Sequence, residues 1–157
     1  MGIKDYLDIA YVYATKASGC CKVAVGSAIV SKDDKIIALG ANQTHPNKCK
    51  TSRGCLRIEK YGNDSKAHRD PADCRAVHSE IDAICAAAVN GTSTKDATIC
   101  VTRYPCENCA RAIVAAGIKN VFYGGTAKIS EDTQDIFSDA DINVYYIEGW
   151  REDNTDR

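Results

Sequence analysis

The order of β-rich and helical segments is the feature of this sequence that most constrains its fold. Residues 23–30 and 35–40 are rich in valine, isoleucine and alanine, and the turn sequence SKDD separates them, which predicts an antiparallel hairpin. Further along, helical patterns alternate with strand patterns, at 77–89, 97–102, 106–117, 120–124, 131–138 and 142–147. A hairpin followed by alternating helices and strands predicts a mixed sheet packed by helices, an α/β sandwich.

The segments outside this alternation complete a single domain of 157 residues. Residues 3–17 place apolar side chains at helical spacing, which predicts an opening amphipathic helix. Residues 41–75 show little periodicity and hold three of the cysteines, and so long an irregular stretch needs a function or a staple such as a metal. The tail, about 148–157, is polar and is expected to fray.

Composition narrows the class of protein. Apolar residues make up 45% and charged residues 26%, the balance of a globular protein, and a net charge of −1 gives no overall basic field to attract nucleic acid. We recognise no secretory signal and no apolar run of about 20 residues. Nine cysteines, an odd number, favour metal ligands plus core thiols over a disulfide framework. Cys85 and Cys100 fall in apolar patterns and are the expected core thiols.

Two short motifs have the spacing of a metal site. In PCENC, Pro105 suits the first turn of a helix, which makes Cys106 and Cys109 neighbours at i and i+3. The positive end of that helix favours the thiolate form that binds zinc. In VHSE, His78 and Glu80 would be about 200° apart around a regular helix. They therefore reach one site only at the frayed start of a helix.

The number of ligands separates a structural from a catalytic zinc. Zinc takes four protein ligands in a structural site, and three plus a water in a catalytic one. His78, Cys106 and Cys109 supply three, and Glu80 is too close in sequence to His78 to be an easy fourth. Glu80 is well placed instead to bind a water whose pKa zinc lowers to about 7, and to carry its proton. The pattern H-x-E followed by P-C-x-x-C is the signature of zinc nucleobase deaminases.

Over about residues 3–148 the sequence resembles deoxycytidylate (dCMP) deaminases of the cytidine deaminase superfamily, close to phage and bacterial members. Besides the zinc motifs, the resemblance is carried by SGCCKVAVGSAIV, GANQTHP, GCLR, CRAVHSEIDAI and AGIKNVFY. It implies a three-layer α/β/α fold with a central mixed five-stranded sheet. It also implies hydrolysis of dCMP to dUMP and ammonia, a step of pyrimidine nucleotide biosynthesis that supplies dUMP for thymidylate synthesis.

The resemblance assigns a role to each site residue. His78, Cys106 and Cys109 are expected to hold the catalytic zinc. Glu80 is expected to carry the water's proton to the base ring and then to the departing amine. The positions implied for substrate binding are Ser18 near the 5′-phosphate, Asn42 at the sugar, Tyr104 at the cytosine amino group, and Val77.

Three departures from the family pattern concern this site. Ser79 stands where H-A-E has alanine, a mild change at a helix start, so we expect activity to survive. Gln43 follows Asn42 where the family usually has glycine, which changes the backbone shape of this loop and puts its ligand contacts in doubt. Arg103 and Tyr104 fill positions at the pocket mouth where smaller residues are common.

The resemblance also implies a second, structural zinc and a regulated assembly. The expected ligands of the second zinc are Cys20, Cys49, His68 and Cys74, with Cys55 and His45 as substitutes. The alternative is that Cys20 and Cys49 are ordinary small buried residues. The family further implies a homo-oligomer, commonly a hexamer, activated by dCTP with Mg²⁺ and inhibited by dTTP. Its members act in the cytoplasm, or in the host cytoplasm for a phage protein, and not at a membrane.

Other interpretations stay open. The substrate could be another cytosine nucleotide, CMP or dCTP. It could also be a base in tRNA or single-stranded DNA, which needs a cationic track and stacking aromatics. A solvated loop explains the basic residues that would form such a track more simply; they are Lys48, Lys50, Arg53 and Arg57. Finally, the chain could be a non-catalytic binding module stapled by zinc, because a lone C-x-x-C is typical of structural zinc knuckles, but this leaves Glu80 without a purpose.

Overall fold

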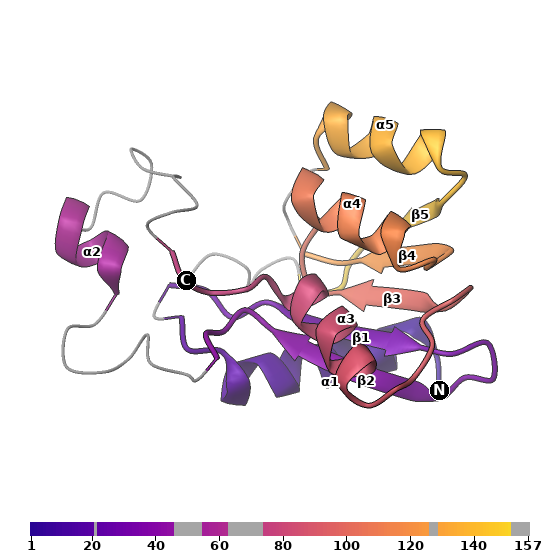
Figure 1. Ribbon diagram of the computed structural model, residues 1–157, viewed down its shortest axis with the longest axis horizontal. Coiled ribbons are helices and arrows are strands. Elements are labelled where there is room, and N and C mark those ends of the chain that lie inside the picture. Colours follow the sequence, from indigo (N-terminus) through magenta and orange to yellow (C-terminus); the bar gives the residue numbers. More distant parts are fainter. Residues whose placement is uncertain (21, 46–54, 63–73, 126–128, 152–157) are drawn as a thin grey trace.

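A computed structural model of the chain describes residues 1–20, 22–45, 55–62, 74–125 and 129–151 (Figure 1). Helices and strands follow one another as α1 (Ile3–Ala17), β1 (Gly26–Val30), β2 (Ile36–Ala41), α2 (Leu56–Tyr61), α3 (Ser79–Val89), β3 (Thr98–Val101), α4 (Glu107–Ala115), β4 (Asn120–Tyr123), α5 (Glu131–Asp139) and β5 (Asn143–Tyr146). None of the described helices is long and apolar enough to span a membrane.

The five strands form one mixed sheet in the order β2-β1-β3-β4-β5. β1 pairs antiparallel with both β2 and β3, whereas β3, β4 and β5 run parallel to one another. A short turn suffices for the β1–β2 hairpin, but parallel neighbours need a crossover, which α4 and α5 supply. The predicted mixed sheet of five strands is confirmed.

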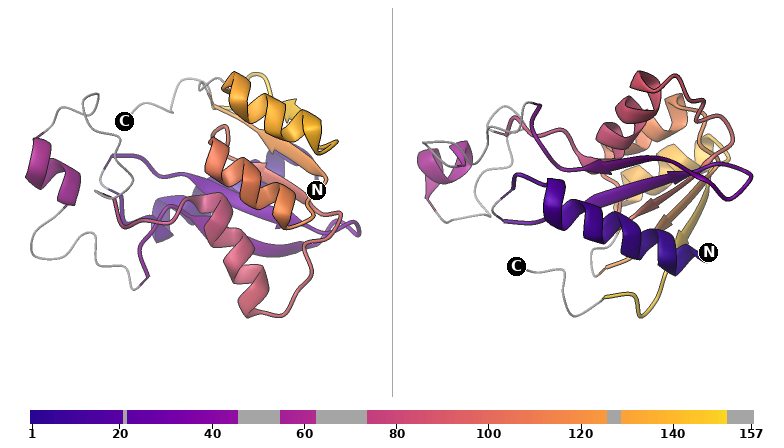
Figure 2. Two further views of the ribbon diagram at one scale, coloured as in Figure 1. Left: turned by 45° about the horizontal axis from the view of Figure 1, so that its top comes forward. Right: turned by 90° about the horizontal axis from the view of Figure 1, so that it is seen from below.

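Helices cover both faces of this sheet, as Figure 1 and Figure 2 show. α1 packs against β1, β2 and β3 on one face, and α3 packs against β1 and β2 on the other, where α4 and α5 continue the layer. The core beneath this second layer is apolar and fully buried, and includes Ile29, Ile99, Val101, Ile113, Ile118, Val121 and Phe137. The three-layer arrangement is therefore confirmed.

Two glycines bring helices close to the sheet from opposite sides. A Cβ at Gly26 would clash with the carbonyl oxygen of Ala10 in α1, and a Cβ at Gly40 would clash with the carbonyl oxygen of Ser79 in α3. Any other residue at these positions would push the backbones apart. For the site, the consequence is that the first turn of α3 lies directly on β2.

The buried face of α3 differs from the predicted one. The sequence pattern predicted a buried stripe of Ile81, Ile84, Cys85 and Ala88, but Cys85 and Ala88 are exposed. The residues that are buried are Ser79, Glu80, Asp82, Ala83 and Ala87. The expectation of a core thiol is therefore wrong for Cys85 and right for Cys100, which is fully buried. A pattern of apolar residues cannot reveal a helix whose polar side chains turn inward toward a site.

Part of the segment 41–75, expected to be irregular, is helical. Among its described residues, Leu56–Tyr61 form the short helix α2, which ends at Gly62. Figure 1 shows α2 apart from the sheet and its covering helices. A helix of six residues has too few turns to produce a recognisable periodicity, which is why the sequence did not predict it.

The start of the C-terminal tail is packed and not frayed. Trp150 is only 5% exposed and joins Tyr6 and Leu7 in a second apolar cluster, on the α1 side of the sheet. The indole Nε1 of Trp150 donates a hydrogen bond to Asp8 Oδ1 at 3.1 Å, and Arg151 Nε donates to the same oxygen at 3.3 Å. The expectation of fraying is wrong for these two residues, because burial of one large aromatic side chain outweighs the polarity of its neighbours.

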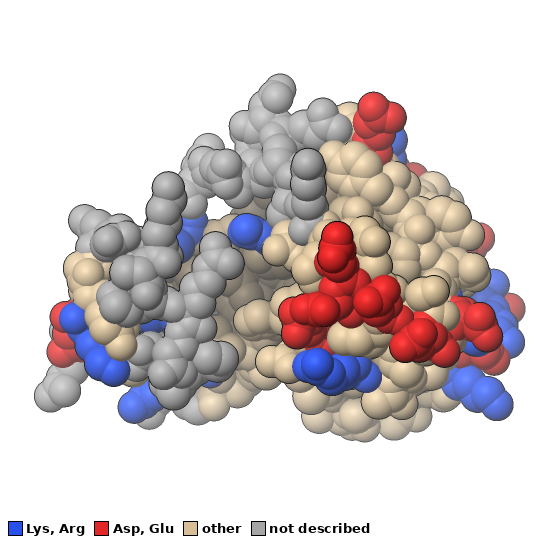
Figure 3. Space-filling view, turned by 90° about the horizontal axis from the view of Figure 1, so that it is seen from above, with Lys and Arg blue, Asp and Glu red and all other residues tan. Residues whose placement is uncertain are grey.

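Acidic side chains gather on the side of the molecule seen from above in Figure 3. The helix α5, which lies on this side in Figure 1, carries Glu131, Asp132, Asp135 and Asp139. A surface of this sign repels the phosphates of a polynucleotide, so the outer surface of α5 is unsuited to nucleic-acid binding.

Candidate active site

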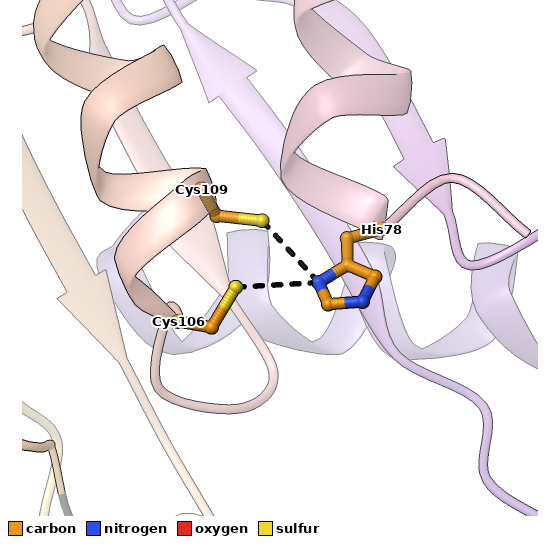
Figure 4. Close-up of side chains that lie close together, drawn as sticks. All are labelled: His78, Cys106 and Cys109. Atoms are coloured by element: carbon orange, nitrogen blue, oxygen red, sulfur yellow. Dashed lines mark hydrogen bonds between the residues drawn. The ribbon is translucent and has the colours of Figure 1, made fainter. Parts of the chain in front are cut away.

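Three potential metal ligands meet between the starts of α3 and α4. His78 Nδ1 lies 3.5 Å from Cys106 Sγ and 3.4 Å from Cys109 Sγ, and the three ligand atoms lie within 4.8 Å of one another. Figure 4 shows the imidazole ring pointing toward both sulfur atoms. The structure thus brings together the three residues that the spacing of the motifs had grouped.

The backbone at the two helix starts explains how these side chains converge. His78 is the N-cap of α3, with φ −69° and ψ 154°, so it is extended and the 200° separation from Glu80 around a regular helix does not apply. Cys106 is likewise an extended N-cap, with φ −79° and ψ 171°. Pro105 is fully buried and precedes this cap, whereas the sequence placed it in the first helical turn. Its fixed φ stiffens the approach to α4.

The donor set and its spacing fit zinc. Bonds of about 2.3 Å to sulfur and about 2.05 Å to nitrogen in a tetrahedral site put these atoms about 3.6 Å apart. The observed nitrogen–sulfur distances of 3.4 and 3.5 Å are close to this value. Three protein ligands also leave a fourth position for water, as catalytic zinc sites require.

Electrostatics favour metal binding by the thiols. Hydrogen bonds from Cys109 and from His78 lower the pKa of Cys106 to about 3, against the effect of burial. The pKa of Cys109 is raised, first because it donates to Cys106 and second because it is buried. The pKa of His78 is also raised, chiefly by its hydrogen bond to Cys106. The three groups share protons that a divalent cation would displace.

Glu80 lies beside these ligands as a buried carboxyl group. It is 4% exposed, and burial raises its pKa. After the hydrogen bond to Cys106 and burial, the nearby Glu80 carboxyl further raises the pKa of Cys109, which places the carboxyl close to the ligand cluster. A buried acid beside a metal site is suited to accept a proton and return it during a reaction.

Ser79, the residue at which the sequence departs from H-A-E, contacts Glu80 directly. It is fully buried, and its hydroxyl lies 2.7 Å from Ser27 Oγ in β1 and 3.1 Å from Glu80 Oε2. An alanine would make neither contact. No sequence pattern pointed to Ser27, because a serine in a strand pattern is more often a solvent-facing or incidental residue.

Asp82 is a second residue whose part the sequence analysis missed. It is 6% exposed, and its carboxylate accepts hydrogen bonds from the Ala41 backbone N–H and the Gln43 side-chain amide, both at 2.9 Å. His45 Nε2 lies 2.6 Å from the other carboxylate oxygen. Because Asp82 and Glu80 share a helix, these bonds fasten the end of β2 and the loop after it to the helix that carries Glu80. The sequence did contain a signal for Asp82, because it is an aspartate inside an otherwise apolar helical pattern. A carboxylate buried there needs hydrogen-bond partners.

The predicted substrate-binding residues are partly assembled on this loop. Ser18 Oγ donates to Asn42 Oδ1 at 2.7 Å, and the Val25 backbone N–H donates to the same oxygen at 2.9 Å. Val77 and Gln43 exchange two backbone hydrogen bonds, of 2.9 and 3.2 Å. The Asn42 side chain thus braces the loop, and the loop lies against the residues that lead into α3.

The other predicted residues at the pocket mouth differ in burial. Tyr104 is half-buried and packs against the apolar core, whereas Arg103 is exposed. Arg57 of α2 lies close enough to His78 for its positive charge to oppose the rise in the pKa of His78. The charge of Arg57 therefore affects the pKa of a candidate metal ligand, although α2 lies apart from the sheet and its covering helices.

The predicted second zinc site falls largely outside the described residues. Cys49 and His68 lie there, whereas Cys20 and Cys74 are described and each is half-buried. Cys20 Sγ accepts a hydrogen bond from the Lys22 backbone N–H at 3.4 Å. The proposed substitutes are also described: Cys55 is half-buried, and His45 is the residue bound to Asp82.

Fold and site together define a class of protein. A mixed sheet with helices on both faces, carrying a histidine, two cysteines and a buried glutamate at the starts of two helices, is the arrangement of zinc-dependent deaminases. Residues 2–125 match the family described as "Cytidine and deoxycytidylate deaminase zinc-binding region". The chain therefore belongs to the cytidine and deoxycytidylate deaminase family, as the resemblance of its motifs had indicated.

Individual relatives agree with this assignment. The deoxycytidylate deaminase of Enterobacteria phage T4 is 30% identical over 176 residues, covering 94% of this chain and 90% of that protein. ComE operon protein 2 of Bacillus subtilis (strain 168) is 33% identical over 132 residues, covering 83% of this chain but 64% of that longer protein. The crystal structure of dCMP deaminase from the cyanophage S-TIM5 in complex with dCMP and dUMP shares the fold, with a TM-score of 0.71, 24% identity, and coverage of 92% of this chain and 95% of that one.

Proposed function

We propose that this chain is a zinc-dependent deaminase that hydrolyses dCMP to dUMP and ammonia. The observation that carries the proposal is the buried Glu80 carboxyl beside the cluster of His78, Cys106 and Cys109. A zinc ion that only stabilised the fold would take four protein ligands and would need no buried acid next to it. Membership of the family and the relatives named deoxycytidylate deaminase in phages T4 and T2 support the choice of reaction and substrate.

These four residues divide into three metal ligands and one proton carrier. His78, Cys106 and Cys109 hold the zinc, which when bound polarises a water so that its pKa falls to about 7. As the water oxygen bonds to the amine-bearing carbon of cytosine, Glu80 accepts one of its protons and delivers it to the ring nitrogen. Glu80 then passes the second proton to the amine, and the bond between carbon and nitrogen breaks to release ammonia.

The substrate is placed by the loop after β2 and by the segments that lead into α3 and α4. We assign Asn42 to the sugar, Ser18 to the side of the 5′-phosphate, and Tyr104 and Val77 to the base. The hydrogen bond between Ser18 and Asn42, and the backbone pairing of Val77 with Gln43, support a single continuous surface.

A substrate panel tests the proposal. Purified, zinc-loaded protein is given dCMP, CMP, dCTP and deoxycytidine, and ammonia release is measured. We expect dCMP to have the highest kcat/KM. A protein that leaves all four unchanged, or that deaminates only single-stranded DNA or tRNA, would contradict the proposal.

A variant at Glu80 tests the mechanism. Glu80→Gln keeps the shape of the side chain but removes the proton carrier, so we expect kcat to fall by about 10²- to 10⁴-fold. Zinc content, measured by atomic absorption, should stay at the wild-type level, which separates loss of proton transfer from loss of metal. Equal turnover by the wild type and the variant would contradict the assigned role.

We also propose the finer features that the family resemblance implies: one catalytic domain, a second zinc held by Cys20, Cys49, His68 and Cys74, activation by dCTP with Mg²⁺, inhibition by dTTP, and a hexameric assembly. The half-buried position of the two described ligands, Cys20 and Cys74, supports the second zinc. Metal analysis should find two zinc ions per chain, and one after Cys74→Ser. Activity with and without the two effectors, and the mass in solution, test the remaining features.

A further inference from the structure

We propose that Ser79 is a positioning residue that aims the Glu80 carboxylate, and that Ser27 of β1 orients Ser79 for this task. The proposal rests on the proposed function, because it explains how the proton carrier of that reaction is held. It concerns two residues that are not among the candidate metal ligands, and the role proposed for both is exerted through Glu80.

A chain of two hydrogen bonds carries the inference. Ser27 Oγ and Ser79 Oγ are 2.7 Å apart, and Ser79 Oγ donates to Glu80 Oε2 at 3.1 Å. A serine hydroxyl has one proton to donate. Since the proton of Ser79 is directed to the Glu80 carboxylate, Ser27 must donate to Ser79. With Glu80 ionised, the order of donation is therefore Ser27, then Ser79, then Glu80.

Burial strengthens these two hydrogen bonds. Ser27 and Ser79 are fully buried and Glu80 is 4% exposed, so water does not compete for these groups. Hydrogen bonds in such surroundings are stronger than in water, and successive bonds polarise one another. A buried hydroxyl that lost its partner would also cost free energy. The arrangement is therefore well defined and resists rotation of the Glu80 side chain.

Both serines stand on rigid parts of the fold. Ser27 lies in β1, the strand between β2 and β3, where it pairs with Gly40 on one side and Val101 on the other. The backbone of Ser79 is in contact with Gly40, where the absence of a side chain brings α3 down onto β2. A group that aims a catalytic side chain works best when it is itself held by such elements.

The position of the Ser79 hydroxyl shows which carboxyl oxygen of Glu80 it holds. Ser79 Oγ lies 3.1 Å from Glu80 Oε2, and a hydroxyl keeps its proton whether or not the neighbouring ligands bind a metal. With Oε2 bound to Ser79, Oε1 is the oxygen that we assign to proton transfer.

A double-mutant cycle tests the inference. The proteins are the wild type, Ser27→Ala, Ser79→Ala and the double variant, all zinc-loaded, with kcat and KM measured for dCMP. We expect Ser79→Ala to lower kcat about tenfold, the range for one lost hydrogen bond to a charged group, with KM changed less than about twofold. Ser27→Ala should lower kcat about threefold to fivefold. The double variant should match Ser79→Ala, because Ser27 has no route to Glu80 without Ser79.

A matched control separates this effect from the loss of a buried hydroxyl in general. Thr133 is fully buried and accepts a hydrogen bond from Ser130 Oγ at 2.9 Å, and it lies in α5, a helix that carries none of the candidate metal ligands. Thr133→Val should lower the melting temperature about as much as Ser79→Ala but leave kcat unchanged. A parallel fall of kcat in this control would mean that the effect of Ser79 is one of stability.

The remaining outcomes overturn the inference in distinct ways. If kcat of Ser79→Ala equals that of the wild type, Ser79 does not aim Glu80. If the effects of the two serine variants multiply in the double variant, Ser27 does not act through Ser79. If the wild type itself deaminates none of the substrates, the proposed function fails and the role of Ser79 fails with it. If the wild type is active and the serine variants are as active, only the inference about Ser79 and Ser27 is contradicted.

Discussion

The two helices that form the site begin in different ways. The start of α3 is fixed by hydrogen bonds between side chains and groups distant in sequence, with Ser27 in β1 and with the loop after β2. The start of α4 follows a fully buried proline, and the residues that it buries are Cys109, Ala110 and Ile113. One start is held by directional polar contacts, and the other by local backbone stiffness and apolar packing.

This difference matches what each helix contributes. α3 carries Glu80, whose carboxyl must point in one direction to move a proton, and directional hydrogen bonds fix the direction as well as the position of a helix. α4 contributes two sulfur atoms, Cys106 and Cys109, and a metal that binds both ligands corrects small errors in their placement. Polar bracing is therefore found where orientation matters more than proximity.

The largest effect is expected at Asp82, on the α3 side. Asp82→Ala removes a buried acceptor and leaves the Ala41 N–H and the Gln43 amide without it, so we expect the free energy of unfolding to fall by about 3 kcal/mol. Urea unfolding of the wild type and the variant, both without metal, measures this loss of unfolding free energy. The matched variant on α4 is Glu107→Ala, which removes a half-exposed carboxylate 3.9 Å from Arg111 and should cost less than about 0.5 kcal/mol. Equal losses of unfolding free energy in the two variants would show that polar contacts do not stabilise the start of α3 more than the start of α4.

Zinc should stabilise the fold by binding residues at the starts of both α3 and α4. Because one ligand comes from α3 and two from α4, we expect free zinc at about 100 times its Kd to stabilise the fold by about 2.7 kcal/mol. Thermal unfolding with zinc, and again after chelation, measures the shift. Cys106→Ser should abolish most of this gain without changing the stability of the metal-free protein by a similar amount. A gain that survives in this variant would place the metal elsewhere.

A smaller effect is expected at Pro105. Pro105→Ala frees the backbone before α4 in the unfolded chain and leaves a small gap in the core, so the expected loss is about 1 kcal/mol. Zinc affinity should fall less than about tenfold, because the ligands remain. Urea unfolding and zinc titration measure the two quantities. A loss as large as that of Asp82→Ala would show that α4 depends on its start as much as α3 does.

The smallest effect concerns the outward face of α3. Cys85 is exposed, so a thiol reagent should label it in the folded protein, and Cys85→Ser should change stability by less than about 0.5 kcal/mol. Cys100 is fully buried, and burial raises the pKa of its thiol to about 12. It should stay unlabelled at pH 8 until the protein unfolds. Mass spectrometry of labelled peptides distinguishes the two cysteines. Slow labelling of Cys85 would show that its side chain is buried, as the apolar pattern of the sequence had predicted.

The sequence predicted features that depend on local pattern. Alternating segments led to the five-stranded sheet, and the spacing within PCENC and VHSE grouped His78 with Cys106 and Cys109 before their geometry was known. The sheet and the pair of Cys106 and Cys109 succeed because residues three apart on a helix, or a strand next to a helix, meet by geometry alone. His78 joined them through the known zinc-deaminase signature, H-x-E followed by P-C-x-x-C.

Apart from the metal ligands, the sequence did not predict contacts between polar residues that are far apart. The bond between Ser27 and Ser79 spans 52 residues, and that between Gln43 and Asp82 spans 39. A serine or an aspartate does not name its partner, because each can bond to backbone, side chain or water. For the same reason the inward face of α3 was missed, since its polar residues are buried by the site and not by the core.

The position of Trp150 gives the protein a natural optical reporter. It is the one tryptophan of the chain, and its ring stands edge-on to Tyr11, with centroids 6.3 Å apart, on the α1 side of the sheet. Its emission reports the docking of the C-terminal segment onto the first helix, in the layer opposite the helices that bear the metal ligands. Stripping the metal should leave the emission wavelength unchanged, and a shift to the red should mark the moment at which Trp150 separates from the first helix.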